Sequence, residues 1–287
     1  MKMPQSIAAG RRAKWVACAL VPLFAATGCQ TVETTHAGVV GVEREQRFTR
    51  LVSEKQVEHQ AAQEYGQMMA AARQKGLLNR DAQQLQRVRT VAQRLIPQVD
   101  AFRPDAVKWA WETNVLTSKE VNAWCMPRGK IAVYTGLLER LHLSDDELAA
   151  VVGHEIAHAL REHAREQMGR QMATQAGTAI GAVALEVLTG VSIDPQLAGT
   201  VSQAVFVLPN SREAEQEADR IGVELAARAG YDPRAAVSLW QKMGQLGGAN
   251  GPEFLSTHPS PAHRLSDLQA NAEKVWPLYQ RAVHQAG

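Results

Sequence analysis

The sequence predicts a mainly helical α+β protein in which a small antiparallel sheet of about three strands packs on a central helix. Apolar residues recur at helical spacing in the stretches 47–75, 81–97 and 144–160, which predicts amphipathic helices. Between them, short alternating runs from Val107 to Tyr134 are bounded by turn residues, which predicts strands. Helical spacing then continues to the end of the chain, so the strands form a minor part of the fold.

The first 28 residues predict a secretion signal. The segment is basic and has no acidic residue: Lys2, Arg11, Arg12 and Lys14. An apolar stretch, 15–26, follows and is too short to span a membrane. Cys29 comes after small residues, as in the cleavage box of a bacterial lipoprotein, so we expect it to become the lipidated first residue. The alternative is an ordinary signal peptide with a chance cysteine.

The lipid would hold the mature chain at the periplasmic face of the outer membrane. Gln30 follows Cys29, where an aspartate would suggest the inner membrane by resemblance to bacterial lipoproteins. Removing residues 1–28 changes the formal net charge from +2 to −2, because four basic residues leave. A nearly neutral chain argues against a nucleic-acid partner and predicts membrane contact through the lipid alone. Cys125 is then the only other cysteine, so no internal disulfide is expected.

Residues 29–46 predict a tether, and residues 47–287 predict a single domain. In that domain we expect a helix over 47–75 and another that Asp81 begins. Three strands are expected at Val107–Thr113, Val121–Cys125 and Lys130–Tyr134. The stretch 171–208 is rich in Ala, Gly, Val and Thr and predicts a helical excursion. It is either a mobile lid over a cleft or a helical hairpin packed on the core.

The most informative motif is His154-Glu155-Ile-Ala-His158. Ser144 and Glu147 precede it as a capping box, so the motif lies on a helix. Histidines four positions apart share one helix face, and both rings can reach one zinc ion. Glu155 can then act as the base towards a water that the metal activates. The alternative is a surface helix with two solvated histidines.

A zinc hydrolase needs a third protein ligand. The metzincin extension fails, because Arg161 and Ala164 stand where Gly and His would be required. A carboxylate from another helix is therefore expected. Glu215 and Asp219 lie four apart on one face of a second helix, and we expect Glu215 to bind zinc. Asp219 would accept the other ring N–H of a ligand histidine.

Other polar residues near this carboxylate pair have simpler interpretations. Asn210 and Glu213 are explained as a helix cap, and Glu217 is expected to face solvent. His142, His163, His263 and His284 lack the spacing of a site and are expected at the surface. The alternative for Glu215 and Asp219 themselves is a charged, solvated helix face.

Together these residues resemble metallopeptidase family forty-eight. The likeness runs roughly from Val121 to Arg264 and includes the edge-strand hairpin after Val121 and the His258-Pro259 segment. It implies a zincin-like metalloprotease core, one zinc ion per chain and a role in protein quality control. Cys125, Met126 and Arg128 depart from the pattern, since small residues are more usual there.

These observations predict a zinc-dependent endopeptidase that cleaves unfolded or misassembled envelope proteins, with outer-membrane assembly machinery as a further partner. The edge strand at Asn122 and Ala123 could bind an extended substrate by β-augmentation. His258 could assist the transition state, close the site as a fourth ligand, or lie at the surface. The alternative function is an envelope assembly chaperone that binds client strands, with cleavage secondary or latched. A catalytically dead scaffold is disfavoured, because ligands and base are all present.

Overall fold

The computed structural model describes residues 30–48, 52–172, 201–206, 208–246, 253–260 and 262–286. The predicted signal segment and the predicted lipidation site, Cys29, lie outside these ranges. Most of the predicted excursion over 171–208 also lies outside them, so the choice between a lid and a packed hairpin stays open.

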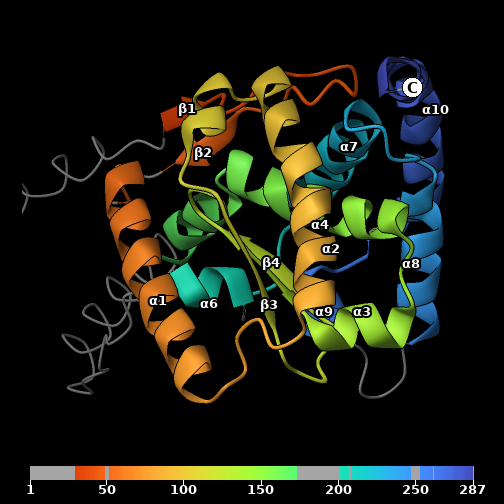
Figure 1. The fold of residues 1–287 in the computed structure, drawn as a ribbon. Coiled ribbons are helices and arrows are strands. Elements are labelled where there is room, and N and C mark those ends of the chain that lie inside the picture. Colours follow the sequence, from red (N-terminus) through yellow and green to blue (C-terminus); the bar gives the residue numbers. More distant parts are fainter. Residues whose placement is uncertain are drawn as a thin grey trace, which may run out of the picture.

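The described chain is mainly helical, as predicted, with two small sheets (Figure 1). The helices are α1 Glu54–Gln74, α2 Ala82–Leu95, α3 Thr135–Leu141, α4 Asp145–Leu160, α6 Val201–Phe206, α7 Arg212–Arg228, α8 Ala235–Gln245, α9 Glu253–Thr257 and α10 Arg264–Ala286. The strands are β1 Gln30–Val32, β2 Gln46–Phe48, β3 Glu112–Leu116, β4 Ala123–Met126 and β5 Lys130–Tyr134. Two 3-10 turns, Ile96–Ala101 and Pro104–Lys108, join α2 to β3.

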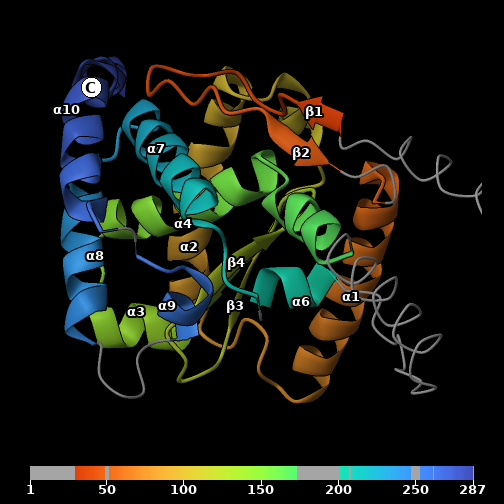
Figure 2. The same ribbon diagram turned by 180° about the vertical axis from the view of Figure 1, so that it is seen from behind.

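Helix α4 forms the centre of the molecule. Ser144 accepts a hydrogen bond from the Glu147 N–H, and the Glu147 carboxylate accepts one from the Ser144 N–H, so the predicted capping box is present. From Glu147 to Leu160 every residue of α4 is buried. Helices α2, α7 and α8 and the larger sheet surround it (Figures 1 and 2). The motif that the sequence singled out therefore lies in the core and not on a solvated face.

The larger sheet has the predicted number of strands but mixed pairing. Its order is β3-β5-β4, with β4 and β5 antiparallel and β3 and β5 parallel. A simple antiparallel meander would place β4 between β3 and β5. Instead, residues 117–122 carry the chain past the end of β5, and β4 then forms the outer edge. The two faces of β4 pack differently: Ala123 and Cys125 belong to the main core, while Trp124 and Met126 belong to a second cluster with residues of α1 and α6.

Two glycines allow α4 and α7 to cross at close range. A Cβ atom on Gly153 would lie 2.9 Å from the Gly222 carbonyl oxygen, and one on Gly222 would lie 2.7 Å from the His154 nitrogen. Contacts this short do not occur between real side chains and backbone, so glycine is required on both helices. The crossing sets His154 directly against α7.

The segment 30–48, which we call the N-terminal strap, is not the tether that the sequence predicted. Its ends pair as the antiparallel strands β1 and β2, and its middle buries Val40 and Val42 in the main core. The Val40 N–H donates to the Glu224 carboxylate at 2.9 Å, and Gln46 is fully buried. These apolar and hydrogen-bonding residues alternate with polar ones, so composition alone concealed the packing. The helix expected over 47–75 begins later, at Glu54.

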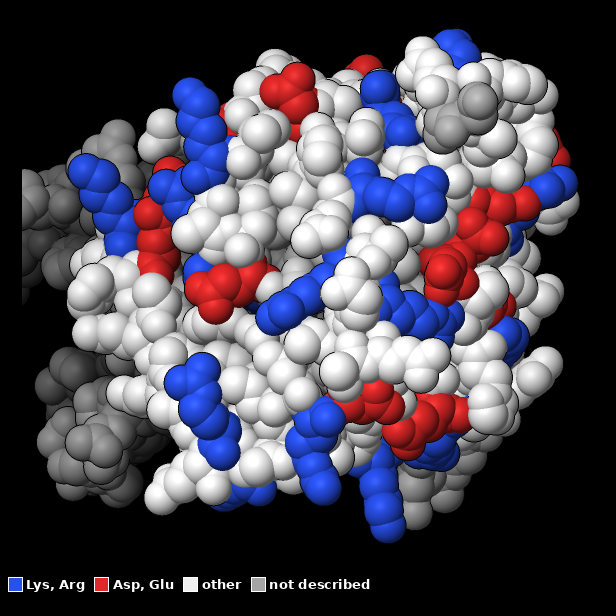
Figure 3. All heavy atoms as spheres, in the orientation of Figure 1, with Lys and Arg blue, Asp and Glu red and all other residues white. Residues whose placement is uncertain are grey.

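Within the described residues, no helix combines the length and apolar character needed to cross a membrane. On the face shown in Figure 3, basic and acidic side chains are interspersed in small groups. The sequence-based expectation that nucleic acid is not a partner stays a prediction.

Candidate metal centre and active site

The two motif histidines lie one turn apart on α4 and converge with a carboxylate from α7. Their Nε2 atoms are 3.0 Å apart. The Glu215 carboxylate lies 3.5 Å from His154 Nε2 and 3.4 Å from His158 Nε2. A tetrahedral zinc ion with bonds of about 2.0–2.1 Å holds its ligand atoms roughly 3.3–3.4 Å apart. The three side chains are therefore spaced as zinc ligands are.

Helix α7 presents both predicted carboxylates on one face. It is capped by Ser211, whose hydroxyl accepts from the Ala214 N–H, and not by Asn210 as predicted. Asp219 Oδ1 lies 3.0 Å from His154 Nδ1, on the opposite side of the ring from Glu215. Arg264 donates to both carboxylates, at 2.7 Å to Asp219 and 3.1 Å to Glu215. The structure thus brings Asp219 to the position where it orients His154 and fixes its tautomer.

His258 joins the same group of side chains. Its Nδ1 atom lies 3.0 Å from Glu215 and 3.3 Å from His154 Nε2. The His258 N–H donates to the Phe254 carbonyl, which holds it at the end of α9. One ligand atom each from His154, His158, Glu215 and His258 lies within 4.8 Å of every other. His258 is therefore a candidate fourth ligand in this arrangement and is not a surface residue.

Glu155 faces a cleft that adjoins these ligands. The cleft is lined by Glu155, His158 and His258 together with Cys125, Pro127 and Ala159. Glu155 Oε1 is buried and has no hydrogen-bond partner among the described residues, and the nearest ring nitrogen of His258 is 3.6 Å away. Burial raises the pKa of the Glu155 carboxyl above its usual value, against a smaller opposing effect of His258 and His154. A carboxylate with a raised pKa and one oxygen that makes no hydrogen bond is suited to proton transfer near neutral pH.

The donor set fits zinc. Imidazole nitrogens and a carboxylate are ligands that zinc accepts in tetrahedral sites. Burial alone would raise the pKa of Glu215, but the three histidines around it hold this pKa well below its usual value. Burial alone would lower the pKa of His154, but Asp219 and Glu215 raise it to about 9. The site therefore keeps a carboxylate ionised in the core and attracts a positive charge to the point where the rings meet.

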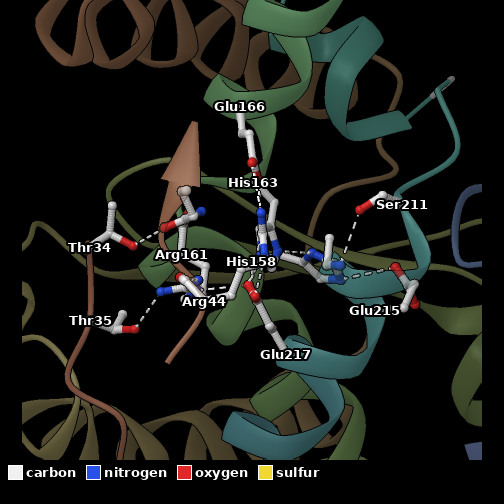
Figure 4. A network of polar contacts seen from close by, with 12 residues as sticks. Thr34, Thr35, Arg44, His158, Arg161, His163, Glu166, Ser211, Glu215 and Glu217 are labelled. Carbon is white, nitrogen blue, oxygen red and sulfur yellow. Dashed lines mark hydrogen bonds and ion pairs between the residues drawn. The ribbon is translucent and has the colours of Figure 1, made fainter. Parts of the chain in front are cut away.

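Two predictions about neighbouring residues were wrong. Glu217 and His163 were expected at the surface, yet their exposed fractions are 5% and 2%. His163 lies 2.8 Å from His158 and 3.1 Å from Glu217, inside the network of Figure 4. Glu217 points away from Glu215 on α7, but that side of the helix is also buried, so Glu217 does not reach solvent. His142, His263 and His284 are exposed, as predicted.

The signal that could have placed His163 is weak. In a continuous helix, residues five apart point about 140° away from each other, so His163 could not contact His158. The structure breaks the helix between them: α4 ends at Leu160, and Glu162 adopts a left-handed backbone conformation with φ of 51°. The sequence has no glycine at this break, which would have indicated it.

The edge strand offers only part of the predicted substrate contact. The Asn122 carbonyl already accepts from the Tyr134 N–H, so it belongs to the sheet. In an antiparallel pair, successive residues alternate between bonding to the neighbouring strand and facing away from it. The backbone N–H and C=O groups of Ala123 and Cys125 therefore face away from β5. The Asn122 side chain accepts from the Ala123 N–H at 2.8 Å. Substrate binding by Asn122 and Ala123 stays a prediction.

A buried helix that carries His-Glu-x-x-His, crossed by a second helix that supplies a carboxylate, defines the class of zinc metallopeptidases. A model of one such family, Peptidase family M48, matches residues 82–272. The chain belongs to this family.

Several named proteins are similar to this chain. The mitochondrial metalloendopeptidase OMA1 of Arabidopsis thaliana is 41% identical over 62% of this chain and 35% of its own length. The OMA1 of Schizosaccharomyces pombe is 34% identical over 61% of this chain and 55% of its own. The beta-barrel assembly-enhancing protease of Yersinia pestis is 30% identical over 67% of this chain and 40% of its own. This chain therefore spans between about a third and about half of the relatives it matches.

These relatives correct the predicted location. We expected the periplasmic face of the outer membrane, but OMA1 proteases of plants, fungi and animals, all named as mitochondrial, are among the relatives. The expectation rested on a basic segment and Cys29. Transit peptides are also basic and poor in acidic residues, so composition does not separate the two kinds of segment.

Proposed function

We propose that this chain is a zinc metalloendopeptidase that cleaves extended segments of unfolded or misassembled proteins. The observation that carries the proposal is the convergence of His154, His158 and Glu215 on one point beside Glu155. The cleft at that point runs beside Cys125 of the edge strand β4, whose outward backbone groups can pair with an extended chain. Backbone pairing is indifferent to side chains, which suits unfolded substrates.

The chain's own residues supply the proton chemistry. Zinc held by the ligands would act as a Lewis acid towards the attacking water and the scissile carbonyl. Glu155 accepts the proton of that water and later passes it to the leaving amine. Asp219 and Arg264 hold His154 and Glu215 in place, so the ligands do not reorganise during the reaction.

The test is Glu155→Gln. Glutamine keeps the size of the side chain but cannot take a proton, so we expect zinc content to stay equal to wild type. Cleavage of an unfolded, casein-type substrate should fall by about 10²–10⁴-fold. The matched control is Glu213→Gln, an exposed residue of the same type on α7, which should cleave as wild type does. Full cleavage by Glu155→Gln, or the absence of zinc from the purified wild type, would sink the proposal.

A second candidate function is supported by two observations. His258 lies in the metal-ligand group, where it would leave little room for a water molecule. Two relatives are named beta-barrel assembly-enhancing proteases. The alternative is a chaperone-like role in which client strands are bound at the edge strand and cleavage is secondary. If Glu155→Gln retains the cellular function of the wild type, binding and not cleavage carries that function.

A further inference from the structure

A chain of hydrogen bonds continues from His158 away from the metal-ligand group. His158 Nε2 faces His154 and Glu215, which leaves its Nδ1 atom on the far side of the ring. That atom lies 2.8 Å from His163 Nδ1, and His163 Nε2 lies 3.1 Å from Glu217 Oε2. His158, His163 and Glu217 are all buried, with exposed fractions of 8%, 2% and 5%. Solvent therefore does not compete for these contacts.

Two arginines bind Glu217, the last residue of this series of hydrogen bonds. Arg161 donates to Glu217 Oε2 at 2.9 Å, and Arg44 of the N-terminal strap donates to the same atom at 3.1 Å. In Figure 4, Arg44 and Arg161 reach this network from the left, and His163 lies above Glu217. With two guanidinium groups beside it, Glu217 is a carboxylate and can only accept hydrogen bonds.

The geometry determines the position of each proton. Because Glu217 only accepts, His163 must donate from Nε2. In the neutral ring the other nitrogen, Nδ1, then carries a lone pair and accepts. Only one hydrogen fits between two nitrogens 2.8 Å apart, so His158 donates it from Nδ1. His158 Nε2 is left with its lone pair directed at the metal-ligand group.

We propose that His163 is a positioning residue that, together with Glu217, fixes the tautomer and ring orientation of the zinc ligand His158. The inference rests on the proposed metal site. The two motif histidines are thereby oriented in different ways: His154 by direct contact with Asp219, and His158 through an intervening imidazole. His163 can contact His158 because the helix is interrupted at Glu162, where the backbone is left-handed.

The test is zinc affinity, measured by competition with a chelator in the full chain. His163→Leu keeps most of the volume and removes the acceptor, and we expect it to bind zinc about 10- to 100-fold more weakly. His163→Asn places an amide oxygen near the position of Nδ1, so it should recover part of that loss. His163→Gln places its amide near Nε2, where it can contact Glu217 but not His158. The exposed His284→Leu is the control and should bind zinc as wild type does.

Each outcome of these measurements either supports or overturns the proposed role of His163. Affinity of His163→Leu within twofold of wild type would overturn the inference. Should His163→Leu fail to fold, the two amide variants decide: tighter binding by His163→Asn than by His163→Gln supports the inference, and equal binding overturns it. If wild type itself binds no zinc, the proposed function fails, and the inference fails with it. That result is distinct from a loss confined to the His163 variants.

Discussion

At the scale of single residues, His258 determines whether the metal site keeps an open position for water. It lies 3.0 Å from Glu215 and 3.3 Å from His154, so a zinc ion at the ligands would have four protein donors and no open position. We therefore expect His258→Ala to raise the rate of casein-type cleavage several-fold, because a water position opens. A rate assay with equal zinc content in both proteins checks this. A fall in rate would instead identify His258 as a donor to the transition state, and an unchanged rate would show that it has neither role.

The pKa of His154 predicts how zinc binding depends on pH. Burial opposes the charged ring, but hydrogen bonds with Asp219 and Glu215 raise the pKa of His154 to about 9. Below pH 9 a proton must leave before zinc binds, so apparent affinity should rise about tenfold per pH unit from pH 7 and level off near 9. Without metal, the same shift stabilises the fold fully below the usual pKa of about 6.5, and this contribution is lost as pH rises through 9.

Chelator competition between pH 6 and 10 measures this dependence. Asp219→Asn removes the main hydrogen-bonding group that raises the pKa of His154, so in this variant the rise in affinity should end at a lower pH. The expectation is contradicted if wild type binds zinc equally well at pH 7 and pH 9. A proton count by calorimetry in two buffers gives an independent check, with about one proton released per zinc at pH 7.

At the scale of helices, the crossing of α4 and α7 positions the ligands. Gly222→Ala would place a Cβ atom 2.7 Å from the His154 nitrogen, so the helices must separate. We expect a loss of about 1–3 kcal/mol in the free energy of unfolding, together with weaker zinc binding, because Glu215 and Asp219 move with α7. Chemical denaturation and chelator competition measure the two effects.

The control for Gly222→Ala is a helical glycine with open space around it. Gly66 lies within α1, and no atom is within 4 Å of a Cβ placed there. Gly66→Ala should therefore stabilise the protein by up to about 1 kcal/mol, through helix propensity alone. If Gly222→Ala is as stable as Gly66→Ala, the close crossing does not restrict the helices.

The helices also show which part of the site the sequence could predict. The positions of His154, His158, Glu215 and Asp219 followed from spacing, because four residues always return to one helix face. The cap at Ser144 followed from local chemistry. His163 and Glu217 could not be placed, because their contact depends on a left-handed residue at Glu162 and on how α7 packs. Likewise, β3 pairs in parallel with β5 because residues 117–122 lead from β3 to the opposite edge of the sheet. The local sequence pattern does not encode the path of that loop.

At the scale of the whole molecule, the N-terminal strap joins parts of the chain that are far apart in sequence. Arg44 forms ion pairs with Glu166 and Glu217, and the Val40 N–H binds Glu224. These contacts link the strap to α7, which carries Glu215, and to Glu166 in the segment that follows α4. The sequence predicted a tether here because the segment is rich in Thr, Val, Gly and Glu.

The strap's contribution is tested by Arg44→Gln. The Arg44 side chain is 30% exposed, while Glu166 and Glu217 are nearly buried, so its removal leaves the Glu166 carboxylate with the Arg47 N–H but without the Arg44 ion pair. Arg161 and His163 still hold Glu217, which limits the cost to about 1–3 kcal/mol. We expect a lower melting temperature and faster proteolytic cleavage within 30–48 than elsewhere in the chain. Arg47→Gln, at an exposed position of the same strap, should change neither. Equal proteolysis of the two variants would show that the strap is held by its apolar residues alone.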